Sequence, residues 1–220
     1  MTGNMYEFVS KTWNPLAGEC FHACGYCSTN SSRKRFPVMR EKYSGDPRII
    51  EKEMLKRFSE RDIVFVVAQN DLFAENVPLE FIRRILNYTL NFKNIFIFQT
   101  KNPKGLKGWN FPKNSEIGIT LESDLWHKVM KNAPEPYQRI EAIEKYQIPI
   151  DFITIEPILN FSSMFIEMIQ KVKPKYVNIG ADSSHGNYEE PSKAKIMQLI
   201  KELEKFTIVK QKTNLKRLLI

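Results

Sequence analysis

The sequence predicts a single α/β domain spanning residues 1–220, with a parallel sheet that forms a partial (β/α)6 barrel. Two observations predict this class. Short runs rich in β-branched and aromatic residues recur along the chain, and amphipathic stretches of helical period lie between most of them. The same alternation is compatible with a full α/β barrel or an open doubly wound sheet, but the partial barrel fits best.

The expected elements follow from these two periodicities. Short buried strands are expected at residues 6–11, 63–68, 95–100, 116–121, 152–156, 176–180 and 206–210. Helices are expected at residues 47–59, 78–91, 137–146, 161–172 and 191–205, the last of which opens with a proline at a helix start. The polar, basic segment 28–46 is expected to be a mobile loop.

Composition indicates an ordinary globular protein. Apolar residues make up 42% of the chain and charged residues 26%, and the longest apolar runs are far shorter than a membrane span of about 20 residues. We therefore expect no membrane association. Residues 1–11 lack the apolar core of a signal peptide, and the odd number of cysteines argues against a disulfide framework, so a reducing, cytoplasmic location is expected.

The chain has only three cysteines, Cys20, Cys24 and Cys27, and they share one loop, which we place at residues 12–30 after the first strand. Three thiolates can bind three irons of a [4Fe–4S] cluster, and without a fourth cysteine one iron keeps an open coordination site. A zinc site completed by His22 is the alternative, because spacing alone does not exclude a Cys3His ligand set.

Polar residues follow most of the expected strands. Because parallel strands end at one edge of a sheet, these side chains are expected to form one ring of ligand-binding groups. The candidates, in chain order, are Asn70, Asp71, Lys101, Thr120, Glu122, Glu156 and Gly180. Lys101 would bind a carboxylate, the acidic groups an ammonium, and Gly180 would let the backbone approach an adenine or ribose. Helix capping by Asn70 or Asp71, and turn positions for the glutamates, are the alternatives.

The cysteine loop resembles that of the radical S-adenosylmethionine (SAM) superfamily, whose Cys-x3-Cys-x2-Cys signature it reproduces, with Tyr26 before the third cysteine. Over most of its length the chain is also similar to the phage-associated three-Cys-motif proteins, which are related to spore photoproduct lyase-type proteins. This similarity is carried by residues 12–15, 70–73, 100–103, 155–157 and 209–211. The chain departs from that group in its compact first cysteine interval and in Ser28, where a tyrosine is common.

The resemblance implies a partial barrel of the radical SAM type and reductive cleavage of SAM to a 5′-deoxyadenosyl radical. It also implies that the three cysteines bind the cluster and that the Tyr26 backbone lies beside adenine. Asn70 or Asp71 would take the position that usually receives the methionyl ammonium. Lys101, Thr120 and Glu122 would contact the ribose and carboxylate.

The expected substrate is nucleic acid, to be modified or repaired, because the net charge of +8 attracts polyanions. Arg33, Lys34 and Arg35 lie beside Phe36 and would contact phosphates, although a solvated basic loop is the alternative. A radical enzyme acting on a peptide or small metabolite, and a zinc-stabilised nucleic-acid-binding module, remain as alternatives. A radical enzyme also needs a reductant or electron-donor protein, and either a large substrate or a partner protein would close the barrel mouth.

Overall fold

Seven parallel strands form the central sheet in the computed structural model, which describes residues 6–183, 186 and 188–220. The strands are β1 (Lys11–Trp13), β4 (Ile63–Val66), β5 (Ile95–Thr100), β6 (Glu116–Thr120), β7 (Phe152–Ile155), β8 (Tyr176–Ile179) and β9 (Ile208–Gln211). They lie side by side in chain order. The expected parallel α/β sheet is therefore confirmed, and its order lacks the reversal of a doubly wound sheet.

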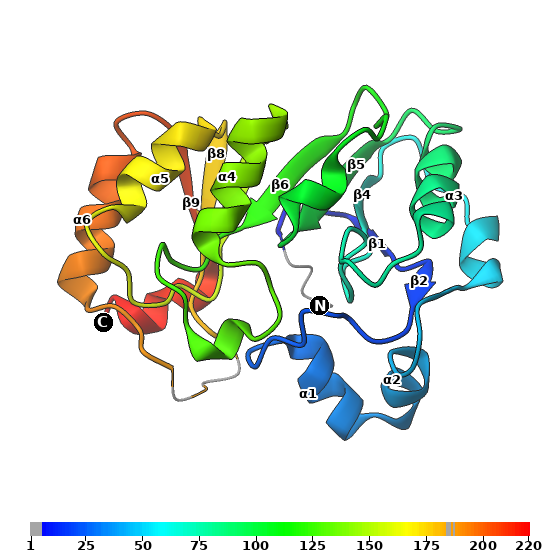
Figure 1. Cartoon of the computed structure of the whole chain (residues 1–220), viewed down its shortest axis with the longest axis horizontal. Helices are drawn as coiled ribbons and strands as arrows, with labels where there is room; N and C mark the ends of the chain where they lie inside the picture. The colour runs from blue at the N-terminus through cyan, green and yellow to red at the C-terminus, as the bar shows by residue number, and fades with distance from the viewer. Residues whose placement is uncertain (1–5, 184–185, 187) are drawn as a thin grey trace.

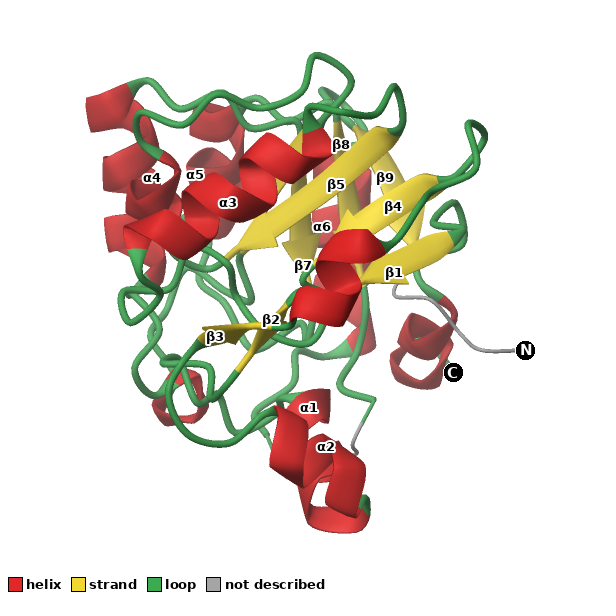
Figure 2. Cartoon of the chain, turned by 90° about the vertical axis from the view of Figure 1, so that its right-hand side faces the viewer, coloured by secondary structure: helices red, strands yellow, loops and turns green. Residues whose placement is uncertain are grey.

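Four helices cover the outer face of the sheet (Figures 1 and 2). They are α3 (Leu79–Thr89), α4 (Pro136–Tyr146), α5 (Phe165–Val172) and α6 (Lys193–Leu203). Each buries an apolar stripe at helical spacing, as α3 does with Ile82, Ile85 and Leu86, and these stripes form the main core with the outer side chains of the strands. No helix in the described part of the chain is long and apolar enough to cross a bilayer.

The inner face of the sheet curves around the segment that precedes β1. Tyr6 is buried there, and its hydroxyl forms hydrogen bonds with Gln99 of β5 and, at 2.5 Å, with Thr154 of β7. A second, smaller apolar cluster surrounds it, with members from β4, β5, β7 and β8. One tyrosine therefore contacts side chains from β4, β5 and β7 on the inner face of the sheet.

The first expected strand, at residues 6–11, and the first expected helix, at residues 47–59, differ from the structure. The first strand is Lys11–Trp13, not residues 6–11, because Tyr6 and Val9 form a turn that packs on the inner face instead of joining the sheet. The helix expected at residues 47–59 is also wrong. Its apolar residues belong to β3 (Arg48–Ile49), which pairs antiparallel with β2 (Leu16–Ala17), and to a 3₁₀ turn, η1 (Glu51–Leu55).

The segment expected to be a basic loop at residues 28–46 contains two short helices, α1 (Ser28–Arg35) and α2 (Pro37–Lys42). Sequence periodicity does not reveal them, because Thr29 is the only buried residue of α1 and α2 buries none. Pro37 occupies the first turn of α2, where proline is favoured. The pair projects away from the sheet in both cartoons (Figures 1 and 2).

We expect Tyr6→Ala to destabilise the fold by about 3–5 kcal/mol, because it empties the centre of the inner cluster. Tyr6→Phe should cost about 1 kcal/mol, because Gln99 and Thr154 each lose a hydrogen bond to the tyrosine hydroxyl. Urea unfolding measures both. Tyr137→Ala is the matched control, since that tyrosine is 63% exposed on α4. A loss no larger than that of the control would show that Tyr6 does not pack inside the sheet.

Candidate functional site

A cavity of about 850 Å³ opens at the carboxyl edge of the sheet and contains most of the expected site residues. Its wall combines the cysteine loop with residues that end or follow β4, β5, β6 and β7. The expected residues that line it are Cys20, Cys24, Tyr26, Cys27, Asn70, Asp71, Lys101, Thr120 and Glu156. Glu122 and Gly180, both in the described part of the chain, lie behind this wall and do not line the cavity.

Two consecutive turns shape the cysteine loop. The amide of Ala23 donates to the Cys20 carbonyl at 3.2 Å, and the amide of Cys27 donates to the Cys24 carbonyl at the same distance. Ala23 has a φ of 48°, the left-handed conformation that reverses the chain between the first two cysteines. All three thiols are free. No group of three or more histidine, cysteine or acidic side chains within the described residues is arranged to hold a metal ion.

The environment of Cys20 and Cys24 favours the neutral form of these two thiols. Burial, followed by the nearby charge of Asp71, raises the pKa of Cys20 to about 12. Burial also raises the pKa of Cys24, against the opposing effect of Lys101. The Cys24 thiol donates a weak hydrogen bond to the Met130 carbonyl at 3.6 Å. Metal binding would therefore release protons from this loop, because the thiolate is the ligand form.

Asp71 is a buried carboxylate that joins the cysteine loop to the sheet. One oxygen lies 2.9 Å from Nε2 of His22 and accepts the backbone amide of Lys101 at 2.8 Å. The Thr100 hydroxyl and the Phe73 amide donate to the other oxygen. Burial alone would raise the pKa of Asp71, but His22 and the further hydrogen bonds lower it overall. Both oxygens are thus occupied by protein donors.

Asn70 also contacts the cysteine loop through its side chain. Its amide donates to the Gly18 carbonyl at 2.9 Å, and its side-chain oxygen accepts the Asp71 amide. Gly18 has a φ of 96°, and a Cβ there would lie 2.4 Å from the Asp46 carbonyl oxygen, so only glycine fits. In this structure Asn70 and Asp71 position the loop.

Glu122 lies at the centre of a second buried network. It is fully buried, and its oxygens accept from Nζ of Lys101 at 2.7 Å, from Nη1 of Arg139 at 2.7 Å and from the Tyr26 hydroxyl. Lys101 also lies 5.1 Å from the centre of the Tyr26 ring. Glu122 therefore ties the second cysteine interval to the end of β6, while Lys101 keeps a position on the cavity wall.

Glu156 is held by two residues near the carboxyl end of the chain. Lys212 forms an ion pair with one oxygen, and the Asn214 amide donates to the other at 2.7 Å. A Cβ on Gly180 would lie 2.7 Å from a Glu156 oxygen. Gly180 thus makes room for this pair, which is a different role from the expected approach to an adenine or ribose.

Sequence reasoning missed several partners of these carboxylates, namely Thr100, Arg139, Lys212 and Asn214. A signal existed for Arg139, because it shares the buried face of α4 with Ile140 and Ile143. An arginine on an apolar helix face requires a buried acceptor. Lys212 and Asn214 follow the last strand, at the same edge as the other site residues.

Replacing Glu122 with glutamine should flatten the dependence of stability on pH. Burial alone would raise the pKa of Glu122, but Arg139 and Lys101 together hold it below its ordinary range. The carboxylate therefore contributes stability above about pH 4.5, and this contribution is lost as the pH falls toward the folded-state pKa. Glu122→Gln should begin about 3 kcal/mol less stable at neutral pH, because Arg139 loses its counter-charge.

Urea unfolding between about pH 7 and pH 3 measures this difference. The matched control is Glu141→Gln, at an exposed position of the same helix as Arg139. If Glu122→Gln retained the wild-type slope, Glu122 would not be ionised in the folded protein.

Comparison with curated proteins finds no match to the chain. A comparison with family models finds one whose description is "Protein of unknown function (DUF5131)", and it matches residues 4–203. That range includes the cysteine loop and the ends of β4 through β8. The match extends over most of the sequence, and the chain therefore belongs to the DUF5131 family.

Proposed function

We propose that this protein is a radical SAM enzyme that binds a [4Fe–4S] cluster and acts on nucleic acid. One observation carries the proposal. The three free cysteines of a Cys-x3-Cys-x2-Cys loop line one large cavity at the carboxyl edge of a parallel sheet. Parallel α/β folds place their chemistry at this edge, and the cysteine spacing resembles that of the superfamily.

We also propose that the sheet is a partial barrel of the radical SAM type. Two features support this. The strand order runs in one direction from β1 to β9, as it does around a barrel wall. In addition, the inner face wraps around Tyr6, whose contacts reach from Phe65 of β4 to Phe152 of β7.

The loop offers the donor set that an iron–sulfur cluster requires. Cys20, Cys24 and Cys27 are free, face one cavity, and would bind three irons while the fourth stays open. Binding would have to bring the thiols together, because they are not grouped for a metal in this structure. Held by these three cysteines, such a cluster would supply the chemistry of one-electron transfer from an external reductant to SAM, whose cleavage would give methionine and the 5′-deoxyadenosyl radical.

The surrounding residues would position SAM and exclude water. Lys101 offers an ammonium group to a carboxylate, since its side chain is 17% exposed and lies on the cavity wall. Thr120 offers a hydroxyl and the Tyr26 backbone a surface for adenine. Glu156, also on the wall, offers a carboxylate to the methionyl ammonium. Asn70 and Asp71 would act indirectly by holding the cysteine loop in place.

Nucleic acid is the proposed substrate class because the chain carries a net charge of +8, which attracts polyanions. A partner protein that covers the mouth and an electron-donor protein complete the proposal. A peptide and a small metabolite are the alternative substrates. The substrate class is identified by testing whether nucleic acid, a peptide or a metabolite stimulates SAM cleavage.

A zinc-stabilised nucleic-acid-binding module is the second candidate, and one observation favours it. Nε2 of His22 is held by Asp71, while its buried Nδ1 has no hydrogen-bond partner among the described residues. Histidine ligands of metals often have this arrangement, with a carboxylate on one nitrogen and the metal on the other. The metal content of the protein separates the two candidates.

The first test is anaerobic reconstitution of the cluster, followed by an assay of 5′-deoxyadenosine formation from SAM with dithionite. Wild type should bind iron and sulfide in equal amounts and form the product. Cys24→Ala should reduce product to background, because only two of the three thiols remain. Ser31→Ala, at an exposed position of α1, is the matched control and should retain activity. A colourless protein that contains zinc and forms no product would contradict the proposal.

The second test concerns Lys101. On the reconstituted protein, Lys101→Met should weaken SAM binding by about tenfold or more, because a charged hydrogen bond to the carboxylate is lost. Equilibrium dialysis measures the affinity, and thermal unfolding checks the fold. Lys104→Met is the control, since Lys104 lines a separate cavity. Equal affinity for SAM in wild type and Lys101→Met would show that Lys101 does not bind the carboxylate of SAM.

A further inference from the structure

The helical pair α1–α2 is a structured unit that contributes little to the hydrophobic core. Arg48 donates hydrogen bonds to the carbonyls of Glu41, Lys42 and Ser44, which closes the end of the pair. Arg33 forms an ion pair with Glu19 at 2.6 Å and fixes α1 to the cysteine loop. Apart from Thr29, the two helices expose or half-expose all their side chains. The stability of the core therefore does not explain their composition.

The composition of the pair is strongly basic. Residues 28–48 contain six cations, Arg33, Lys34, Arg35, Arg40, Lys42 and Arg48, against two acids, Glu41 and Asp46. Three of the cations, Lys34, Arg35 and Arg40, are exposed and form no ion pair within the described residues. Exposed cations without counter-charges raise the local potential and attract phosphates.

An aromatic side chain lies among these cations. Phe36 separates α1 from α2 and is 50% exposed, and the Arg35 guanidinium lies 5.7 Å from the centre of its ring. Exposed aromatic rings beside arginines are the elements on which unpaired bases stack. A basic surface that served solubility alone would not require an exposed aromatic ring such as Phe36.

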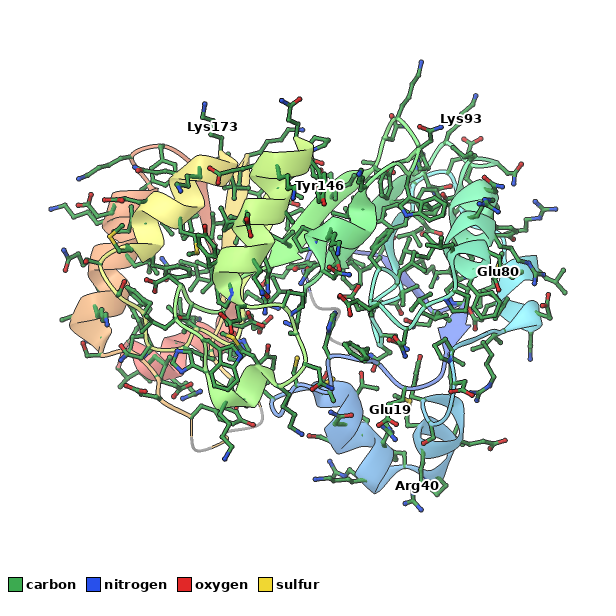
Figure 3. The ribbon with its side chains drawn as sticks, in the orientation of Figure 1. Glu19, Arg40, Glu80, Lys93, Tyr146 and Lys173 are labelled. Carbon is green, nitrogen blue, oxygen red and sulfur yellow. The ribbon has the colours of Figure 1, made fainter. Side chains whose placement is uncertain are left out.

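The pair also forms part of the wall of the candidate active site. Thr29, Asn30, Arg33 and Tyr43 line the large cavity together with the three cysteines. A strand bound along the exposed side of the helices would therefore be close to the cavity. Arg40 lies on this projecting pair, whereas Lys93 and Lys173 lie on the opposite side of the molecule (Figure 3).

We infer that the α1–α2 pair binds a single-stranded segment of nucleic acid, with Lys34, Arg35 and Arg40 on its phosphates and Phe36 stacked on a base. This inference rests on the proposed function for its biological role, because it supplies the surface that would bring the substrate to the cavity. The binding itself depends on neither the cluster nor SAM. It can therefore be measured on the protein as purified.

The test is fluorescence anisotropy with a labelled single-stranded oligonucleotide of roughly 20 nucleotides. The variant Lys34→Glu/Arg35→Glu/Arg40→Glu should lose at least about tenfold in affinity, and the slope of log affinity against log salt should fall by about two, because about 0.7 counterions are released per phosphate contact. Phe36→Ala should weaken single-strand binding by about tenfold and duplex binding much less.

The matched control is Lys93→Glu/Lys113→Glu/Lys173→Glu, which changes the net charge equally at exposed positions. Lys93 and Lys173 lie on the opposite side of the molecule (Figure 3), and Lys113 is next to Asn114, whose amide donates to the Lys93 carbonyl. Equal losses in both triple variants would overturn the inference, because net charge alone would then explain binding. Binding to anionic lipid vesicles without binding to the oligonucleotide would also overturn it.

The outcome is separable from that of the proposed function. Selective loss in the α1–α2 variant, together with a wild-type protein that cleaves no SAM, would support the binding surface and contradict the radical chemistry. Cleavage of SAM by a protein that binds no oligonucleotide would support the radical chemistry and contradict the binding surface.

Discussion

The buried carboxylate of Asp71 is the interaction on which the rest of the site depends. Its partners come from the cysteine loop, through His22, and from the end of β5, through Thr100 and Lys101. A charge buried this deeply is tolerated only when its oxygens are paired. The need to satisfy Asp71 therefore fixes the loop, which has little regular structure, against the end of β5 in the central sheet.

Glu122 repeats this arrangement two strands further along the sheet, because Asp71 follows β4 and Glu122 follows β6. His22 lies between the first two cysteines and contacts Asp71, while Tyr26 lies between the second and third and contacts Glu122. Each interval of the cysteine motif thus contains one side chain that is attached to a buried carboxylate. The motif is anchored through the residues between its cysteines, and none of the three thiols is in a disulfide.

The sheet and the helices α3 to α6 were predictable because each combines a strong periodicity with deep burial. The helices α1 and α2 were not, because a helix without an apolar face has no such periodicity. The gathering of polar side chains around one cavity was also predictable, since parallel strands end at one edge of the sheet. What the sequence did not reveal was pairing. From the sequence, Asp71 and Glu122 could contact either a ligand or another side chain. The structure shows that they pair with His22 and Arg139, which are distant in sequence.

Lys101 connects the two carboxylates to the cavity. Its backbone amide donates to Asp71, its ammonium contacts Glu122, and its side chain also lines the cavity. An anionic ligand that attracted this ammonium would leave Glu122 paired with Arg139 and Tyr26, so the buried charge would keep two partners. Arg139 is fully buried and does not line this cavity, whereas Lys101 does. The network can therefore offer one cation to the cavity without leaving its buried carboxylate unpaired, as the proposed carboxylate-binding role of Lys101 would require.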